Sequence, residues 1–150
     1  MRRTSKLITS ACIAALVLAA CGSDYKGLSK AEFVKQADAI CVKNQAETEK
    51  LAKAVGDNPT IAQVKDVYAD QLIPAFDDQV DELRALKPPE ADRETISKML
   101  DDLSAGIDEA GASIAAMKSL KELDALEEPA GFKSANAAAK AYGLKKCSEE

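Results

Sequence analysis

The chain has 150 residues, of which 47% are apolar and 30% charged, with a net charge of −5 and neither histidine nor tryptophan. This composition is typical of one small globular domain and argues against a disordered or fibrous protein. Because histidine is absent, a Ser-His-Asp or Cys-His nucleophile and a His-ligated zinc or haem centre are excluded. The sequence therefore indicates location and architecture more directly than chemistry.

The N-terminus has the organisation of a secretory signal. Arg2, Arg3 and Lys6 precede an apolar segment that is shorter than the roughly 20 residues a membrane-spanning helix needs. Its last four residues, Leu-Ala-Ala-Cys21, resemble the lipobox of bacterial lipoproteins. The resemblance implies that residues 1–20 are a cleaved signal peptide and that Cys21 is the lipidation site. The alternative is a secreted protein cleaved nearby, in which Cys21 is an ordinary thiol.

The net charge of the processed protein predicts how it attaches to the membrane. The signal holds three of the 20 basic residues, so 17 remain against 25 acidic residues, a net charge of −8. An acidic surface disfavours nucleic acid and anionic lipid headgroups. We therefore expect attachment to the outer face of the cell membrane through acyl chains. Residues 21–28 then form a short tether, and residues 29–150 form the folded domain.

Helix signals begin directly after the tether. Ser29 and Glu32 have the spacing of a capping box, and Gly56 ends the first predicted helix. The second predicted helix opens at Thr60 and carries apolar residues at helical spacing. Pro74 lies within that pattern, so we expect the second helix to kink or break there.

Two further helices complete the predicted fold. The third begins at Ala91 or Asp92 and has apolar residues in heptad-like steps, which a self-associating coiled coil would also use. Gly106, Ala110 and Gly111 make this seam narrow and locally weak, which favours packing in a bundle. Pro129–Gly131 is the predicted connection to a last short helix, for which Gly143 is the C′ residue. No stretch alternates as a strand would. The predicted fold is all-α, an antiparallel up-down-up-down four-helix bundle.

Cys41 and Cys147 are the two cysteines left outside the signal and Cys21. Exported proteins fold under oxidising conditions that favour pairing. Cys41 lies about 16 Å above the start of the first helix, and a descending last helix brings Cys147 to a similar height. We predict a disulfide between them. A redox-active pair and two free buried thiols are the alternatives, and no CxxC spacing or histidine supports activation.

Three short motifs add a second resemblance. They are Ile-Cys-x-x-Asn, Leu-x-x-Leu-x-Pro-Pro and Tyr-Gly-Leu-x-x-Cys. Together with the lipobox they are similar to small helical lipoproteins of actinobacterial type. The resemblance spans most of the processed chain and implies a helical fold with two cysteines, and it brings no assigned activity. The residues that carry it are Ile40, Cys41, Asn44, Leu83, Leu86, Pro88, Pro89, Tyr142, Gly143, Leu144 and Cys147.

Carboxylates are the remaining candidates for chemistry. The candidates are adjacent pairs, which point to different faces of a helix, and no calcium-binding loop is present. Few aromatic residues are available to stack on a sugar, as a glycosidase would require. We therefore predict no enzyme, no metal and no cofactor. The pairs are Asp77 and Asp78, Asp81 and Glu82, Asp101 and Asp102, Asp108 and Glu109, and Glu127 and Glu128.

A ligand pocket is the main open question. Tyr68, Leu72 and Phe76 lie near Pro74, and the small residues Gly106, Ala110 and Gly111 of the third helix are potential partners across the core. The gap between them predicts an apolar pocket, and the alternative is that the small residues simply let helices approach closely. We predict a non-catalytic module that binds another component of the cell envelope, such as a protein. A carrier of a small apolar or amphipathic ligand is the alternative.

Overall fold

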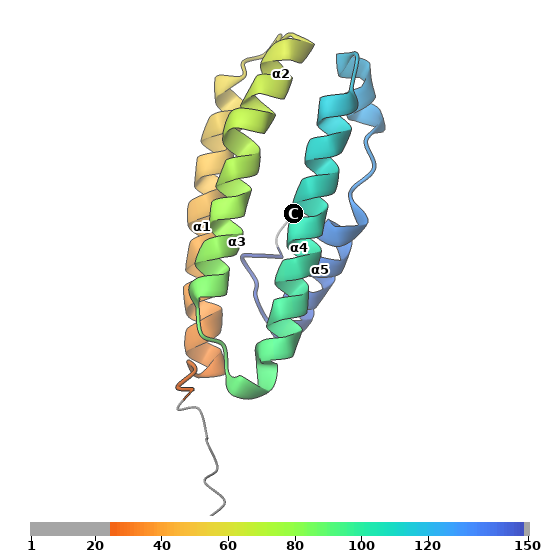
Figure 1. Ribbon diagram of the computed structural model, residues 1–150. Coiled ribbons are helices and arrows are strands. Elements are labelled where there is room, and N and C mark those ends of the chain that lie inside the picture. The colour runs from red at the N-terminus through yellow and green to blue at the C-terminus, as the bar shows by residue number, and fades with distance from the viewer. Residues whose placement is uncertain (1–24, 149–150) are drawn as a thin grey trace, which may run out of the picture.

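The computed structural model describes residues 25–148. The predicted signal peptide, residues 1–20, lies outside the described residues, as do Cys21 and residues 22–24. Between residues 25 and 148 the regular structure is all helical, which confirms the all-α class (Figure 1). The α-helices are α1 (Lys30–Ala54), α2 (Ile61–Val67), α3 (Ile73–Ala85), α4 (Arg93–Ala116) and α5 (Ala130–Tyr142).

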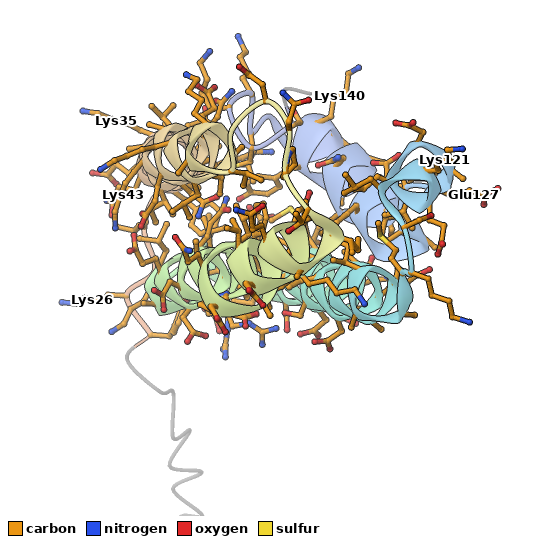
Figure 2. All side chains as sticks on the ribbon, turned by 90° about the horizontal axis from the view of Figure 1, so that it is seen from above. Lys26, Lys35, Lys43, Lys121, Glu127 and Lys140 are labelled. Atoms are coloured by element: carbon orange, nitrogen blue, oxygen red, sulfur yellow. A yellow bond between two sulfur atoms is a disulfide. The ribbon has the colours of Figure 1, made fainter. Side chains whose placement is uncertain are left out.

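Consecutive arms of the structure alternate in direction (Figure 1). α1 rises from the lower end, α2 and α3 return, α4 rises again and α5 descends. Close packing joins α1 to α3, α3 to α4 and α4 to α5. Viewed from above, the labelled side chains of Lys35, Lys43 and Lys140 point away from the bundle (Figure 2). The core between the helices contains Phe33, Ala37, Leu83, Ile96, Leu100, Ile107 and Leu144.

Local hydrogen bonds start the first two helices where the sequence predicts them. The backbone N–H of Glu32 donates to Ser29 Oγ at 3.3 Å, and the N–H of Ser29 donates to Glu32 Oε2 at 3.2 Å. Thr60 and Gln63 form the same reciprocal pair at the start of α2. α1 ends just before Gly56, whose φ of 79° is the left-handed conformation that glycine adopts without strain. Both capping boxes satisfy donors that a helix terminus otherwise exposes.

The α-helix is interrupted just before Pro74, where the sequence predicts a kink or a break. A π-turn at Tyr68–Leu72 joins α2 to α3, and Pro74 lies in the first turn of α3. The N–H of Ile73 donates to the carbonyl of Tyr68, five residues back. This wider turn accommodates the proline, because its missing N–H is not needed in the first turn of a helix. The second predicted helix is therefore two α-helices and a π-turn, and the bundle has five α-helices instead of four.

The connection between α4 and α5 differs from the predicted one. It contains a 3₁₀ segment at Leu120–Ala125, and α5 already begins at Ala130, so Gly131 is helical instead of part of a linker. A Cβ on Gly131 would come within 2.3 Å of the carbonyl oxygen of Asp102, and one on Gly106 within 2.5 Å of the Phe132 ring. Glycine at both positions therefore lets α4 and α5 approach closely.

The predicted disulfide is confirmed. Cys41 in α1 and Cys147 are bonded, with 5.2 Å between their Cα atoms. Gly143, at φ 103°, ends α5 as predicted, and the N–H of Leu144 donates to the carbonyl of Ala139 at 2.9 Å. Leu144 is fully buried. The turn after α5 thus leads the chain back across the core to α1.

Removal of the disulfide should lower stability strongly. The bond closes a loop with a sequence separation of 106 residues. The chain-entropy model gives such a bridge about 4 to 5 kcal/mol. We expect the double variant Cys41→Ser with Cys147→Ser to lose free energy of unfolding of that order in urea titrations. The reduced native protein is the control and should unfold like the variant. Equal midpoints for the oxidised protein and the variant would contradict the prediction.

Candidate functional site

A pocket of about 320 Å³ lies beside the disulfide, among α1, α3, α4 and α5. Its volume is at the lower end of the roughly 300 to 1,000 Å³ of small-molecule sites. Both cysteines of the bridge line it. Helices distant in sequence build this site, because α1 and α5 contribute one wall each and α3 and α4 close the side between them.

The interior of the pocket is apolar. Its buried lining residues include Leu83 of α3, Met99 and Leu100 of α4, and Ala135 and Ala139 of α5. Small alanine side chains on α5 face larger ones on α3 and α4, and the space that they leave is the pocket. Such a lining favours the apolar part of a ligand, because burial of apolar surface is favourable.

Amide side chains form a polar wall on the same pocket. Asn44 of α1 is buried and its Nδ2 donates to the carbonyl oxygen of Ala75 in α3 at 2.8 Å. Gln79 Nε2 lies 3.2 Å from the Sγ of Cys41. Gln45 and Asn136 also line the pocket. These groups offer neutral donors and acceptors, which position a ligand without a charged partner.

The sequence pattern that marks this polar wall is an interruption of the apolar stripe of α1. Asn44 and Thr48 stand in the apolar stripe of α1, where a core helix ordinarily carries apolar residues. Both line the pocket, and so does Asn136 on the inner part of α5. Polar residues in an inward stripe are thus the pattern that marks the site, and the sequence prediction did not use it.

The three predicted pocket residues do not meet in one site. Phe76 lines the pocket beside the disulfide. Tyr68 lines a separate hollow of about 430 Å³ between the π-turn and α4, together with Ile73 and Gly111. Leu72 is buried and lines neither. The π-turn explains the separation, because its extra residue rotates the side chains before it relative to those after it.

A larger hollow of about 690 Å³ lies at the α3–α4 connection. Its lining includes charged side chains of both signs, such as Arg84, Lys87 and Glu94. Arg84 Nη2 is already bound to Asp101 Oδ1 at 2.9 Å. An apolar ligand there would desolvate these charges, which is costly. The pocket beside the disulfide is therefore the better candidate.

Three carboxylates, those of Glu32, Asp77 and Asp102, have shifted pKa values, and none of them lines this pocket. Hydrogen bonds from the Ser29 hydroxyl and backbone N–H lower the pKa of Glu32. Desolvation is the main cause that raises the pKa of Asp77, and the nearby carboxylates of Asp108, Asp81 and Asp78 raise it further. Asp102 is the opposite case. Hydrogen bonds from Lys98 Nζ at 2.7 Å and from the Ser134 hydroxyl at 2.6 Å lower its pKa.

Residues 25–148 contain no group of three His, Cys, Asp or Glu side chains placed to hold a metal ion. Among the helices of the same range, none has the length and apolar character to cross a membrane. No protein-family model matches the chain, and no curated protein or solved structure matches it either. Any functional proposal therefore depends on the pocket and on the sequence motifs.

Asp77→Asn and Asp102→Asn should change stability in opposite directions at neutral pH. A raised pKa means that folding opposes ionisation, so Asp77→Asn removes an unfavourable charge and stabilises the protein. A lowered pKa means that folding favours the carboxylate, so Asp102→Asn destabilises it. Urea midpoints measured from about pH 7 to about pH 3 test both.

The pH dependence separates ionisation from packing. The gain from Asp77→Asn should disappear as the pH falls through the raised pKa of Asp77, where the native side chain is also neutral. The loss from Asp102→Asn should persist to lower pH, begin to fade as the pH falls below the ordinary aspartate pKa of the unfolded chain, and vanish below the lowered pKa of the folded state. Shifts of equal sign, or shifts that do not vary with pH, would contradict the assignment.

Proposed function

We propose that the protein is a lipid-anchored, extracytoplasmic binding protein that takes a small amphipathic ligand into the pocket beside the disulfide. The observation that carries this proposal is the pocket itself, with an apolar interior and a wall of neutral amides. Such a combination is the usual composition of a small-molecule site. The four alternating arms of the bundle provide the rigid frame around it.

The lining favours an uncharged ligand. Glu128 and Lys146 are its two charged residues, one of each sign, and both are exposed. A charged ligand buried among Leu83, Met99 and Leu100 would lose its hydration without an opposite charge beside it. A molecule with an apolar body and a neutral hydrogen-bonding group avoids this loss. Amides such as that of Gln45 then hold its polar group.

Sequence and structure together support the extracytoplasmic location. The basic residues, apolar segment and Leu-Ala-Ala-Cys21 run occur in the order that a lipoprotein signal requires. The disulfide between Cys41 and Cys147 is a bond typical of exported proteins. Two or more acyl chains on Cys21 suffice for stable membrane attachment, so the acidic domain needs no basic patch.

Binding of another envelope protein stays a prediction without a specific surface. Val42, Leu120 and Leu126 are the large apolar side chains exposed in the described part of the chain, at 36 to 47%. Val42 lies on α1, whereas Leu120 lies in the 3₁₀ segment and Leu126 just after it. Scattered exposed apolar residues are normal on a monomeric protein. The pocket therefore gives ligand binding the stronger support.

Asn136→Phe should block the pocket. Asn136 lines the pocket and is partly exposed, so the larger ring occupies ligand space with little cost to the core. We expect the wild type to bind the uncharged fluorophore N-phenylnaphthylamine at one site, and the variant to bind it at least about tenfold more weakly, or about 1.4 kcal/mol. Ala137→Phe is the matched control, because Ala137 is exposed and does not line the pocket. It should bind as the wild type does.

Native mass spectrometry identifies the natural ligand. Protein released in mild detergent from its own membranes should carry a small adduct that Asn136→Phe lacks and Ala137→Phe retains. The absence of any adduct in the wild type, together with no saturable binding of the fluorophore, would overturn the proposal.

Cys21→Ser tests the anchor independently. The native protein should be found in the membrane fraction with an intact mass that includes acyl chains and begins at Cys21. The variant lacks the sulfur that accepts the diacylglyceryl group, so it should lack the acyl mass. An unacylated native protein in the soluble exported fraction would contradict lipidation while leaving the pocket untouched.

A further inference from the structure

The chain that leads into α1 is fastened to the α3–α4 connection, which lies at the same end of the bundle (Figure 1). The hydroxyl of Tyr25 donates to the carbonyl oxygen of Pro88 at 2.7 Å. The backbone N–H of Leu28 donates to the carbonyl oxygen of Lys87 at 2.8 Å. Residues 87 and 88 belong to the α3–α4 connection, so both ends of the segment 25–28 are held to it. We call this segment the N-terminal clamp.

Two further features fix the clamp. The guanidinium of Arg93, at the start of α4, lies 4.6 Å from the centre of the Tyr25 ring, a cation–π distance. A Cβ on Gly27 would come within 2.3 Å of the carbonyl oxygen of Pro88. Only glycine fits there without a shift, because the backbone passes directly over the connection. The predicted tether is therefore bound to the domain over its second half.

The clamp shortens the free link to the lipidated residue. Four residue steps separate Cys21 from Tyr25 and span at most about 13 to 14 Å, whereas a tether that is free as far as Ser29 would span about 26 to 29 Å. We propose that the clamp holds the α3–α4 end of the bundle against the surface of the bilayer that carries the acyl chains of Cys21. This inference rests on the lipidation part of the proposed function.

Charge at this end is compatible with a membrane surface. The processed protein is acidic, and an acidic face would be repelled by anionic lipids. The α3–α4 end is instead balanced, because basic side chains accompany its acids. They are Lys26, Lys30, Lys87 and Arg93 beside Glu32, Glu90, Asp92 and Glu94.

The orientation also sets the height of the pocket above the bilayer. Cys41, which lines the pocket, lies about 16 Å along α1 from the start of the helix, and the far end of α1 lies about 38 Å from that start. With the α3–α4 end at the bilayer, the pocket therefore stands above the headgroups.

Energy transfer to the membrane tests the orientation. The full-length, acylated protein is reconstituted in vesicles that contain an acceptor dye on lipid headgroups. A donor dye is attached at Glu90→Cys, in the α3–α4 connection, or at Asp57→Cys, at the opposite end. We expect several-fold more efficient transfer from position 90 than from position 57. Equal transfer from the two positions, or the reverse order, would overturn the inference.

Tyr25→Ala tests whether the N-terminal clamp causes the orientation of the domain on the bilayer. The substitution removes both the hydrogen bond to Pro88 and the contact with Arg93. The tether then lengthens, and the difference in transfer between positions 90 and 57 should shrink. Lys50→Ala changes an exposed side chain of α1 that lies outside both the clamp and the α3–α4 end, and it should leave the difference unchanged. An unchanged difference in Tyr25→Ala would overturn the role of the clamp.

Intact mass distinguishes this failure from failure of the proposed function. A protein without acyl mass that does not sediment with vesicles overturns lipidation and this inference together. An acylated, vesicle-bound protein with equal transfer from both positions overturns the inference alone.

Discussion

The bond between Cys41 and Cys147 is the constraint on which the site depends. Close packing joins each α-helical arm to the next along the chain, so α1 and α5 are the arms that the connections do not bring together. The turn after α5 makes that link: Leu144 fills the core, and Cys147 joins α1 covalently. The pocket lies directly above this link, and both cysteines line it. Phe33 of α1 and Tyr142 of α5 also pack edge to face, with 5.9 Å between their ring centres, so the disulfide adds to a direct contact of the two helices. The same bond that stabilises the domain therefore also forms part of the pocket lining.

Polar side chains keep the pocket from collapsing. Asn44 is buried in α1, and burial of an unbonded amide is costly, so its Nδ2 is bound to the carbonyl oxygen of Ala75. This bond ties α1 to α3 at the height of the pocket. Further apolar collapse of the two helices would have to break it. Gln79 adds a second polar contact between the same helices, at the sulfur of Cys41. The wall of the pocket is thus held by directional bonds and its interior by apolar packing.

Local signals in the sequence were sufficient to predict most helix ends. They were not sufficient to predict the tertiary features. The capping box of Ser29 and Glu32 and the left-handed Gly143 depend on residues within a few positions, so their spacing alone predicts them. The disulfide followed from the expected heights of two helices. The π-turn before Pro74 could not be predicted in this way, because a kink, a break and a π-turn all accommodate a proline. The pocket depends on which side chains face one another across four helices. For that reason, the sequence identified Phe76 but grouped it with Tyr68, which faces another hollow.

The two chain ends of the described domain are both tied back to the bundle, and this limits how the site can open. The N-terminal clamp binds the α3–α4 connection, and the disulfide binds the C-terminal turn to α1. Neither end is free to swing outward and release a helix. The exposed lining residues Gln45 and Glu128 can move instead, because side chains at a surface change rotamer far faster than bonded helices separate. A ligand that enters between them needs no rearrangement of the core. For the ligand proposed above, the fixed frame would select by size and the amide wall by hydrogen-bonding groups.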